Sequence, residues 1–391
     1  MKLNRAASLF LSIALLASVV VGYSTTASAV GNPNCNAVDG DYIVSFAPGV
    51  SVDKEIKSAP GRAVSAFHRY EAVLNGFAAS LSAEQACAFE KRPNIRYVEL
   101  DSIVTTQAIT ESALSWGLDR IDQTSLPLLG TYEYNSTGAG VTAFVIDTGI
   151  SNTNKDFGTR LLSHENFTKD RKNYDCNGHG THVAGTIGGT KYGIAKSVSL
   201  IGLKVLNCQG SGTISGVIAG VNRAATLHTT QPAVANMSLG GGVSPSLDAA
   251  VLALINDGVT VVVAAGNESA DASTSSPANV DAAITVAASS SNDSFAGFSN
   301  FGSKVDLIAP GVEITSDWLV SSTNKAGVNT ISGTSMASPH VAGVAARYLS
   351  TAPTSTPTQV RTALVGAATT GVVSGVPALT VNKLLFIGKD N

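Results

Sequence analysis

The chain has 391 residues and a formal net charge of −3, with 44% apolar residues against 14% charged ones. The apolar content excludes a disordered chain and is sufficient for one large folded domain with smaller attachments. The absence of a basic patch argues against nucleic-acid binding.

The first residues have the layout of a secretory signal peptide. Lys2 and Arg5 precede an apolar run from Leu9 to Gly22, and a small-residue site follows at 27–29. A membrane anchor is the alternative, but the run is shorter than the roughly 20 residues that a spanning helix needs. We therefore predict export, cleavage after Ala29, and no membrane-spanning segment later in the chain.

Residues 30–108 are predicted to form a small α+β unit. Strand-like segments at 42–46 and 95–99 stand on either side of a helical stretch at 82–91. From the residues alone, this unit could be an unrelated small binding module.

Residues 109–391 are predicted to form a large α/β domain, because apolar strand segments alternate with helical ones. The strand segments are 141–146, 198–205, 233–239, 260–265 and 282–287, and helices are expected at 215–225 and 246–256. This alternation predicts a parallel central sheet covered by helices on both faces. Ligands bind beyond the carboxyl ends of such strands. Asp147, Ser238 and Asn267 each stand at or just past such an end.

A nucleophilic serine is indicated by Gly-Thr-Ser-Met-Ala-Ser-Pro-His at 333–340, where Ser335 precedes an apolar helical run. A serine that only caps a helix is the alternative. Two upstream motifs argue against it: Val-Ile-Asp-Thr-Gly at 145–149 and Asn-Gly-His-Gly-Thr-His at 177–182. A serine hydroxyl becomes a nucleophile when a histidine takes its proton and a buried carboxylate orients that histidine.

Together these motifs, in the chain order Asp, His, Ser, closely resemble the subtilisin-like serine proteases, and within them the secreted proteinase K and aqualysin group. The resemblance covers nearly everything after Ile109. It implies a subtilisin-like fold and peptide-bond hydrolysis through an acyl-enzyme. It assigns the catalytic triad to Asp147, His179 and Ser335, and the oxyanion-binding amide to Asn267.

Two further histidines stand in or beside these motifs. The group's catalytic histidine comes first in His-Gly-Thr-His, so His182 is expected to be structural. His340, which follows the nucleophile, is expected to be a packed histidine. A zinc pair is disfavoured because the spacing lacks the glutamate of His-Glu-x-x-His.

A weaker likeness over 41–108 implies that the small unit is a ferredoxin-like, inhibitor-like propeptide. Its position between an export signal and a protease domain favours this reading over the unrelated binding module. The mature enzyme would begin near Ile109, with Trp-Gly-Leu-Asp-Arg-Ile-Asp-Gln at 116–123 matching the group's mature N-terminal region. The expected partners are polypeptide substrates and the chain's own propeptide, acting as intramolecular inhibitor and chaperone. We expect a monomer.

Substrate binding is implied by the resemblance as well. Two extended segments would hold a peptide between them as an added strand, which gives affinity with little side-chain selectivity. The residues concerned are Gly210, Ser211, Gly212, Ser238, Leu239 and Gly240, with Ala264 and Gly266 in the wall of the specificity pocket. Broad specificity follows, with an uncharged or apolar residue preferred at P1, the position before the cleaved bond. The glycine-rich stretch lacks the spacing of a dinucleotide-binding loop.

Four cysteines in an exported chain indicate disulfides, and the sequence alone allows three pairings. A zinc site is a poor alternative because no close Cys-x-x-Cys pair exists. The resemblance implies a bond between Cys176 and Cys208, which leaves Cys35 and Cys87 as the second pair. The group's other bridge is expected to be absent, since Ser275 and Lys304 stand near its positions.

The resemblance also implies bound calcium that is structural and takes no part in catalysis. The expected ligands are hard oxygen atoms, which suit Ca²⁺. One site would use the Asp306 carboxylate and two main-chain carbonyls, those of Asp281 and Ala283. A second site would use Asp119, Asp122 and Gln123. At the position of Leu129, members of the group can have a further acidic ligand, which this chain lacks.

The sequence argues against two rival functions. An esterase of the α/β-hydrolase type would need Gly-x-Ser-x-Gly and the order Ser, Asp, His, and neither is present. A non-enzymatic binding protein on the same scaffold would be expected to have lost a triad or oxyanion residue. All four are in place, so the sequence favours an active secreted serine endopeptidase.

Overall fold

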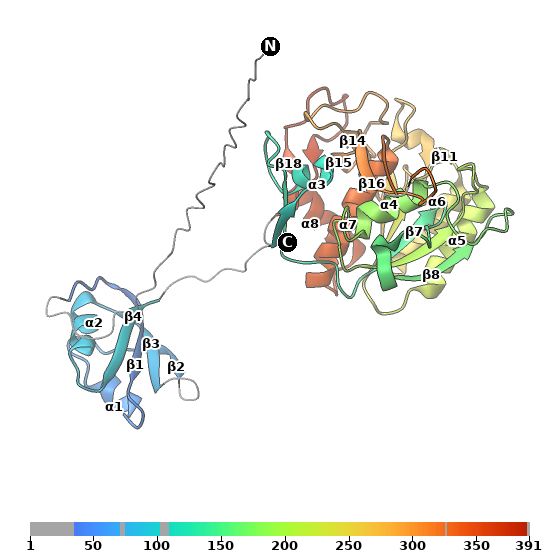
Figure 1. Ribbon diagram of the computed structural model, residues 1–391. Coiled ribbons are helices and arrows are strands. Elements are labelled where there is room, and N and C mark those ends of the chain that lie inside the picture. Colours follow the sequence, from blue (N-terminus) through green and yellow to red (C-terminus); the bar gives the residue numbers. More distant parts are fainter. Residues whose placement is uncertain (1–34, 71–74, 102–108, 325–326, 389–391) are drawn as a thin grey trace, which may run out of the picture. The chain divides into compact units, whose positions relative to one another are not determined.

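The computed structural model describes residues 35–70, 75–101, 109–324 and 327–388 (Figure 1). The chain divides into two compact units, one up to residue 105 and the other from residue 106 onward. The predicted signal peptide at 1–29 and the predicted cleavage region near Ala108 lie outside the described residues. Within the described ranges, no helix combines the length and the apolarity needed to cross a membrane.

The first unit is an antiparallel sheet with two helices, in the strand order β2-β3-β1-β4. This β-α-β-β-α-β arrangement confirms the predicted ferredoxin-like unit. Helix α2 begins after Ser82, whose side chain forms a reciprocal capping box with Gln85. The rings of Phe46, Phe77 and Phe89 form the centre of the core. The elements are β1 (Gly40–Phe46), α1 (Val52–Lys57), β2 (Ala66–Tyr70), β3 (Asn75–Leu81), α2 (Ala83–Glu90) and β4 (Ile95–Leu100).

The second unit is built on a nine-stranded sheet with the order β18-β19-β15-β14-β12-β10-β7-β9-β8. All neighbouring pairs are parallel except the edge pair of β18 and β19. The predicted parallel sheet is confirmed, with one antiparallel edge strand that the sequence analysis did not predict. The strands are β7 (Thr142–Asp147), β8 (Leu161–Asn166), β9 (Ser199–Lys204), β10 (Ala233–Met237), β12 (Thr260–Ala264), β14 (Ile284–Ser289), β15 (Leu307–Pro310), β18 (Thr369–Thr370) and β19 (Lys383–Leu384).

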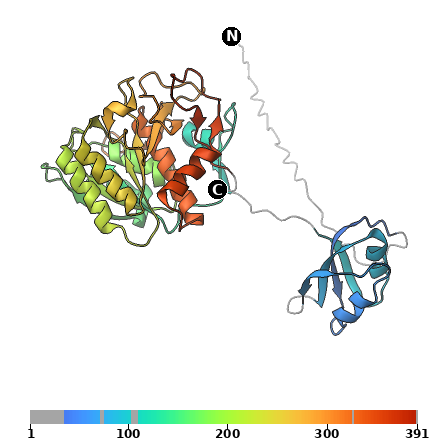
Figure 2. The same cartoon turned by 180° about the vertical axis from the view of Figure 1, so that it is seen from behind.

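Helices cover both faces of this sheet, because successive side chains of a strand point to opposite sides. In β7, Ala143 and Val145 belong to a core cluster shared with α4 and α7, whereas Phe144 and Ile146 belong to a cluster shared with α5 and α6. Seen from behind, α5 and α6 lie side by side across the sheet (Figure 2). The helices are α3 (Trp116–Ile121), α4 (His179–Gly188), α5 (Ile214–Leu227), α6 (Pro245–Asn256), α7 (Thr334–Thr351) and α8 (Pro357–Ala367).

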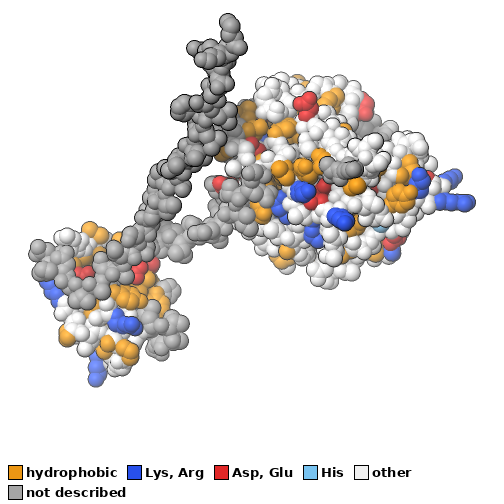
Figure 3. All heavy atoms as spheres, viewed as in Figure 1, with side chains coloured by type: hydrophobic (Ala, Val, Ile, Leu, Met, Phe, Trp, Pro, Cys, Tyr) orange, Lys and Arg blue, Asp and Glu red, His pale blue; other side chains and the backbone are white. Residues whose placement is uncertain are grey.

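Short elements complete the second unit. They are β5 (Ile109–Ser112), β6 (Thr131–Tyr134), η1 (Lys155–Arg160), β11 (Gly241–Gly242), η2 (Ala272–Thr274), β13 (Ser275–Ser276), β16 (Ile314–Asp317) and β17 (Val328–Ile331). On the face of this unit shown in Figure 3, lysine and arginine side chains are scattered and do not gather in one patch.

Candidate active site

A cleft of about 770 Å³ lies where strands β7, β10 and β12 end. Thr148 follows β7, Ser238 follows β10, and Gly266 follows β12, and all three line the cleft. The fold therefore places the cleft at the carboxyl edge of the parallel sheet, as predicted. Every residue predicted to bind substrate lines it: Gly210, Ser211, Gly212, Ser238, Leu239, Gly240, Ala264 and Gly266.

Asp147 and His179 form a hydrogen-bonded pair beside this cleft. Asp147 is the last residue of β7 and is fully buried, while His179 opens α4 and lines the cleft. Asp147 Oδ1 lies 2.8 Å from His179 Nδ1 and also accepts the Thr148 N–H at 2.7 Å. Burial opposes protonation of His179, but the Asp147 charge and hydrogen bond outweigh it, with help from Asp175, and raise its pKa. This pair can hold a protonated imidazole, as a general base must.

Ser335 is the second residue of α7, and the start of this helix is shaped by two neighbours. Pro339 has no N–H to donate to the Ser335 carbonyl, which accepts the Ser238 hydroxyl at 2.8 Å instead. The Ser335 hydroxyl donates to the Ser238 carbonyl at 3.2 Å. The Ser238 side chain therefore fixes the Ser335 backbone. Ser335 and His179 both line the cleft.

Asn267 lines the cleft next to this helix start. Its Oδ1 accepts the Thr334 N–H at 2.8 Å and the Thr334 hydroxyl at 3.0 Å. With the amide oxygen held by α7, the amino end of Asn267 is the one left to donate into the cleft. The N–H of Ser335, in the first turn of α7, has no acceptor within its own helix. Two donors therefore stand at the same helix start.

Comparison with known proteins identifies the family. Residues 138–382 match the sequence pattern described as Subtilase family. The chain belongs to the subtilase family. Residues 41–107 match the pattern described as Peptidase inhibitor I9. This subtilase is therefore a subtilisin-like serine peptidase with an inhibitor-type propeptide, and the predicted family and enzyme class are confirmed.

Individual relatives agree with this membership. The chain is 52% identical over 318 residues to an extracellular serine proteinase of Thermus sp. (strain Rt41A), covering 81% of this chain and 76% of the relative. It is 50% identical over 320 residues to alkaline serine exoprotease A of Vibrio alginolyticus, covering 80% of this chain and 58% of the relative. It is 52% identical to a cold adapted subtilisin-like serine proteinase of known crystal structure, with a TM-score of 0.67, covering 71% of this chain and 98% of that one.

The other two histidines of the motifs are packed inside the subtilase unit. His182 Nε2 bonds to the Ile314 carbonyl at 2.9 Å, and burial lowers the pKa of His182 to about 3. His340 Nδ1 bonds to the Met336 carbonyl at 2.8 Å, and burial lowers the pKa of His340 to about 4. Burial disfavours the charged form of both side chains, and neither lines the cleft.

A charged residue of the cleft was missed by the sequence analysis. Glu268 follows Asn267 and lines the cleft, and its Oε2 accepts the Asn267 N–H at 2.9 Å and the Asn300 side chain at 2.8 Å. A Cβ placed on Gly266 would lie 2.6 Å from the same oxygen. A carboxylate therefore lies against the residue predicted to form the pocket wall. A glutamate in a loop carries no motif, so only its position next to Asn267 could have indicated this.

The predicted first calcium site surrounds a buried carboxylate. Asp306 accepts the Thr285 N–H at 2.9 Å through Oδ2, and its Oδ1 pairs with the Arg361 guanidinium. Burial raises the pKa of Asp306 even though these partners lower it. Both carboxylate oxygens therefore already have donors, one of them the cationic Arg361, and a Ca²⁺ ion would be a further partner. Asp281 lies nearby, with its exposed side chain 2.5 Å from Lys304.

The predicted second site also contains a half-buried acid. Burial raises the pKa of Asp122 to about 6, assisted by the charges of Asp119 and Glu133. Gln123 Oε1 is buried and has no hydrogen-bond partner in the part of the chain that the structure describes. Asp119 accepts the N–H groups of Leu129 and Gly130 at 3.0 and 2.7 Å. These oxygens match the ligand type that Ca²⁺ requires.

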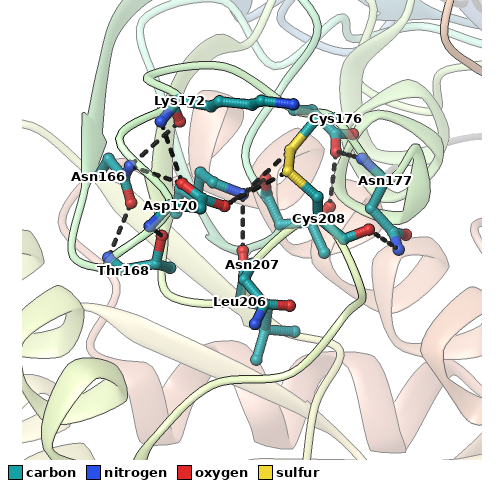
Figure 4. Close-up of polar contacts among 12 residues, drawn as sticks. Asn166, Thr168, Asp170, Lys172, Cys176, Asn177, Leu206, Asn207 and Cys208 are labelled. Carbon is teal, nitrogen blue, oxygen red and sulfur yellow. Dashed lines mark hydrogen bonds and ion pairs between the residues drawn. A yellow bond between two sulfur atoms is a disulfide. The ribbon is translucent and has the colours of Figure 1, made fainter.

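Two disulfides join the four cysteines, Cys35 to Cys87 and Cys176 to Cys208. The second links the loop before His179 to the segment before Gly210, and Figure 4 shows it beside Asp170. Among the described residues, Asp170 and these two cysteines are the only group of three acid, histidine or cysteine ligands close enough to share a metal. Because both sulfurs are bonded to each other, they are not available as thiolate ligands.

We expect thiol labelling of the unreduced mature enzyme to leave Cys176 and Cys208 unmodified. The bond closes a loop of sequence separation 32, for which the chain-entropy estimate is about 3 to 4 kcal/mol of stability. Mild reduction should therefore lower both the thermal midpoint and the activity. Modification of both thiols without prior reduction would exclude the bond in the secreted protein.

Proposed function

We propose that the chain is a secreted serine endopeptidase, made as a self-processing zymogen, in which Asp147, His179, Ser335 and Asn267 are the catalytic residues. The observation that carries the proposal is the meeting of the Asp147–His179 pair, the Ser335 helix start and the Asn267 amide at one cleft. This arrangement suits acyl transfer from a peptide bond.

In the proposed mechanism, the Ser335 hydroxyl turns from the Ser238 carbonyl to His179 Nε2 and loses its proton as its oxygen attacks the peptide carbonyl carbon. Asp147 holds the Nδ1–H and stabilises the imidazolium. The Asn267 amino group and the Ser335 N–H donate to the developing oxyanion, where one side-chain donor contributes about 3 to 4 kcal/mol. His179 then gives the proton to the leaving amine, and water hydrolyses the acyl-enzyme by the same route.

Secretion is supported by three observations. The first residues have signal-peptide character. All four cysteines are paired, which requires an oxidising compartment. The Thermus relative is described as extracellular. The match to a peptidase inhibitor upstream of the subtilase region supports a zymogen in which the first unit inhibits the second.

The function is tested by adding casein to the purified secreted protein, with and without a serine-directed inhibitor. Internal cleavage fragments that disappear with the inhibitor are expected. Hydrolysis of a simple ester with intact casein would instead favour an esterase, and no hydrolysis of either substrate would favour a binding protein.

Specificity is proposed to be broad, with uncharged or apolar P1 residues preferred. The segments at 210–212 and 238–240 both line the cleft and contain glycines, so a peptide can pair with their main chains. Ala264 and Gly266 provide a small, apolar wall for the P1 side chain. The Glu268 carboxylate adds negative charge at this wall, which should reject acidic P1 residues.

We expect Glu268→Gln to increase kcat/KM for a peptide with glutamate at P1 by about fivefold, since an exposed charge pair contributes about 1 kcal/mol at most. Glutamine keeps the oxygen that accepts from Asn267, so kcat/KM for the matched peptide with glutamine at P1 should stay constant. Equal changes for both peptides would show that Glu268 acts on the oxyanion site and not on P1 charge.

A further inference from the structure

A lysine is fully buried beside the catalytic aspartate. Lys204 ends strand β9, and its side chain has no exposure to solvent. In the parallel pairing of β7 with β9, Lys204 is the register partner of Asp147. A buried ammonium group costs free energy unless its N–H donors are all satisfied. Its partners therefore show what the side chain holds.

The three donors of Lys204 reach three different segments around the cleft. Nζ lies 3.1 Å from the Thr148 carbonyl, 2.8 Å from the Leu206 carbonyl and 3.2 Å from Asp170 Oδ2. Thr148 directly follows Asp147. Leu206 lines the cleft and leads to the predicted substrate segment at 210–212. Asp170 belongs to the connection from β8 to α4, the helix that His179 opens.

Main-chain contacts show why this location matters for Asp147. The Asp147 carbonyl accepts the N–H groups of Val205 and Leu206 at 2.8 and 3.1 Å. The Thr148 N–H donates to the Asp147 carboxylate, and the Thr148 hydroxyl accepts the Gly180 N–H at 2.8 Å. Thr148 thus orients the carboxylate that holds His179, and Lys204 fixes the carbonyl of Thr148. A displaced Thr148 would misplace its hydrogen bond to Asp147.

Asp170 supplies the negative charge that balances the Lys204 ammonium group. Burial opposes ionisation of Asp170, but hydrogen bonds from the Lys172 N–H, Thr168, Lys204 and Asn166 hold its pKa at about 2. Figure 4 shows Asn166 and Thr168 around Asp170, next to the disulfide. The Cys176 sulfur lies 3.8 Å from the Lys204 nitrogen. Lys204 therefore stands where the disulfide, the Asp147 turn and the substrate segment meet.

We propose that Lys204 is a positioning residue of the catalytic centre: its ammonium group fixes the Asp147–Thr148 turn and the segment leading to Gly210 relative to each other. This inference rests on the proposed function, because it acts through Asp147 and His179. Neutralising Asp170 is a separate, structural role of the same charge. The two roles predict different outcomes when both charges are removed together.

The test compares three variants: Lys204→Met, Lys204→Arg and the double variant Lys204→Met with Asp170→Asn. Immobilised wild-type enzyme cleaves each precursor to its mature form. The concentration of active enzyme is then determined by active-site titration. We expect Lys204→Met to lower kcat on a peptide amide by about 10- to 100-fold. The acid limb of its kcat/KM profile should move to lower pH, because a misplaced Asp147 supports the His179 imidazolium less well. Lys204→Arg should recover most of kcat.

The double variant separates positioning from charge balance. It removes the acid that has lost its ammonium partner, so its thermal midpoint should return toward that of wild type while kcat and the pH profile stay altered. Recovery of kcat together with the midpoint would overturn the proposal, as would a wild-type kcat in Lys204→Met. If Lys204→Met does not fold, kcat of the double variant decides in the same way.

Two controls complete this test. Lys383→Met removes another lysine of the same sheet that donates to a main-chain carbonyl, that of Val365 at 2.8 Å, and should leave kcat and its pH profile unchanged. Ser335→Ala in the same assay checks the proposed function separately. Activity of Ser335→Ala close to that of wild type would refute the catalytic assignment, and normal activity in Lys204→Met would refute only the positioning role.

Discussion

Replacing Ser335 with alanine is expected to leave the precursor uncleaved between its inhibitor-type unit and its subtilase unit. The hydroxyl is the proposed nucleophile, and alanine keeps the helix start while removing the reacting oxygen. Activity should fall by about 10⁶-fold, the size of the loss in subtilisin itself. Gel analysis and N-terminal sequencing of the purified protein would show one chain that still carries the first unit.

Ser350→Ala is the matched control for this experiment. Ser350 lies on the same helix, and its hydroxyl donates to the Arg347 carbonyl at 2.7 Å, outside the cleft lining. This variant should process itself normally. Efficient maturation of purified Ser335→Ala with no other protease present would contradict self-processing. Cleavage of that variant by added wild-type enzyme would show that its junction is still accessible and that only catalysis is missing.

The sheet and its helices were predictable because each depends on a local pattern. The apolar run at 141–146 became β7, and the run at 260–265 became β12, since buried parallel strands are apolar on both faces. The position of Asp147 at a strand end followed from the same pattern. The roles of the triad residues could be predicted only from the three motifs together, because a serine at a helix start, considered alone, is an ordinary helix cap.

Contacts that depend on strand order could not be predicted. Lys204 interrupts an apolar run and carries no motif, and its importance appears only once β9 is placed between β7 and β8. The ion pair of Asp306 with Arg361 joins residues 55 positions apart. Glu268 gained significance through Asn300, which comes from a separate loop. Partners at such distances are chosen by the tertiary fold, which local periodicity does not encode.

Removing calcium is expected to lower the thermal midpoint of the mature enzyme. We propose that Ca²⁺ is bound by the Asp306 carboxylate with the carbonyls of Asp281 and Ala283, and by Asp119, Asp122 and Gln123 at the second site. Burial raises the pKa of Asp306 and of Asp122, and a bound cation would favour the charged form of each carboxylate. A cation bound only by the folded state stabilises it by about 2.7 kcal/mol at one hundred times its dissociation constant. A chelator should therefore lower the midpoint by about 5 to 10 °C.

Three variants assign this calcium dependence to a site. Asp306→Ala also breaks the contacts with Arg361 and Thr285, so its midpoint should be low with or without chelator, and the difference between the two conditions is the informative quantity. That difference should shrink in Asp306→Ala and persist in Asp281→Ala, because Asp281 contributes only its carbonyl. A residual difference in Asp306→Ala that disappears in Asp122→Asn would belong to the second site. Equal midpoints for metal-free wild-type enzyme before and after calcium addition would contradict both sites, since an ion that prefers the folded state must raise the midpoint.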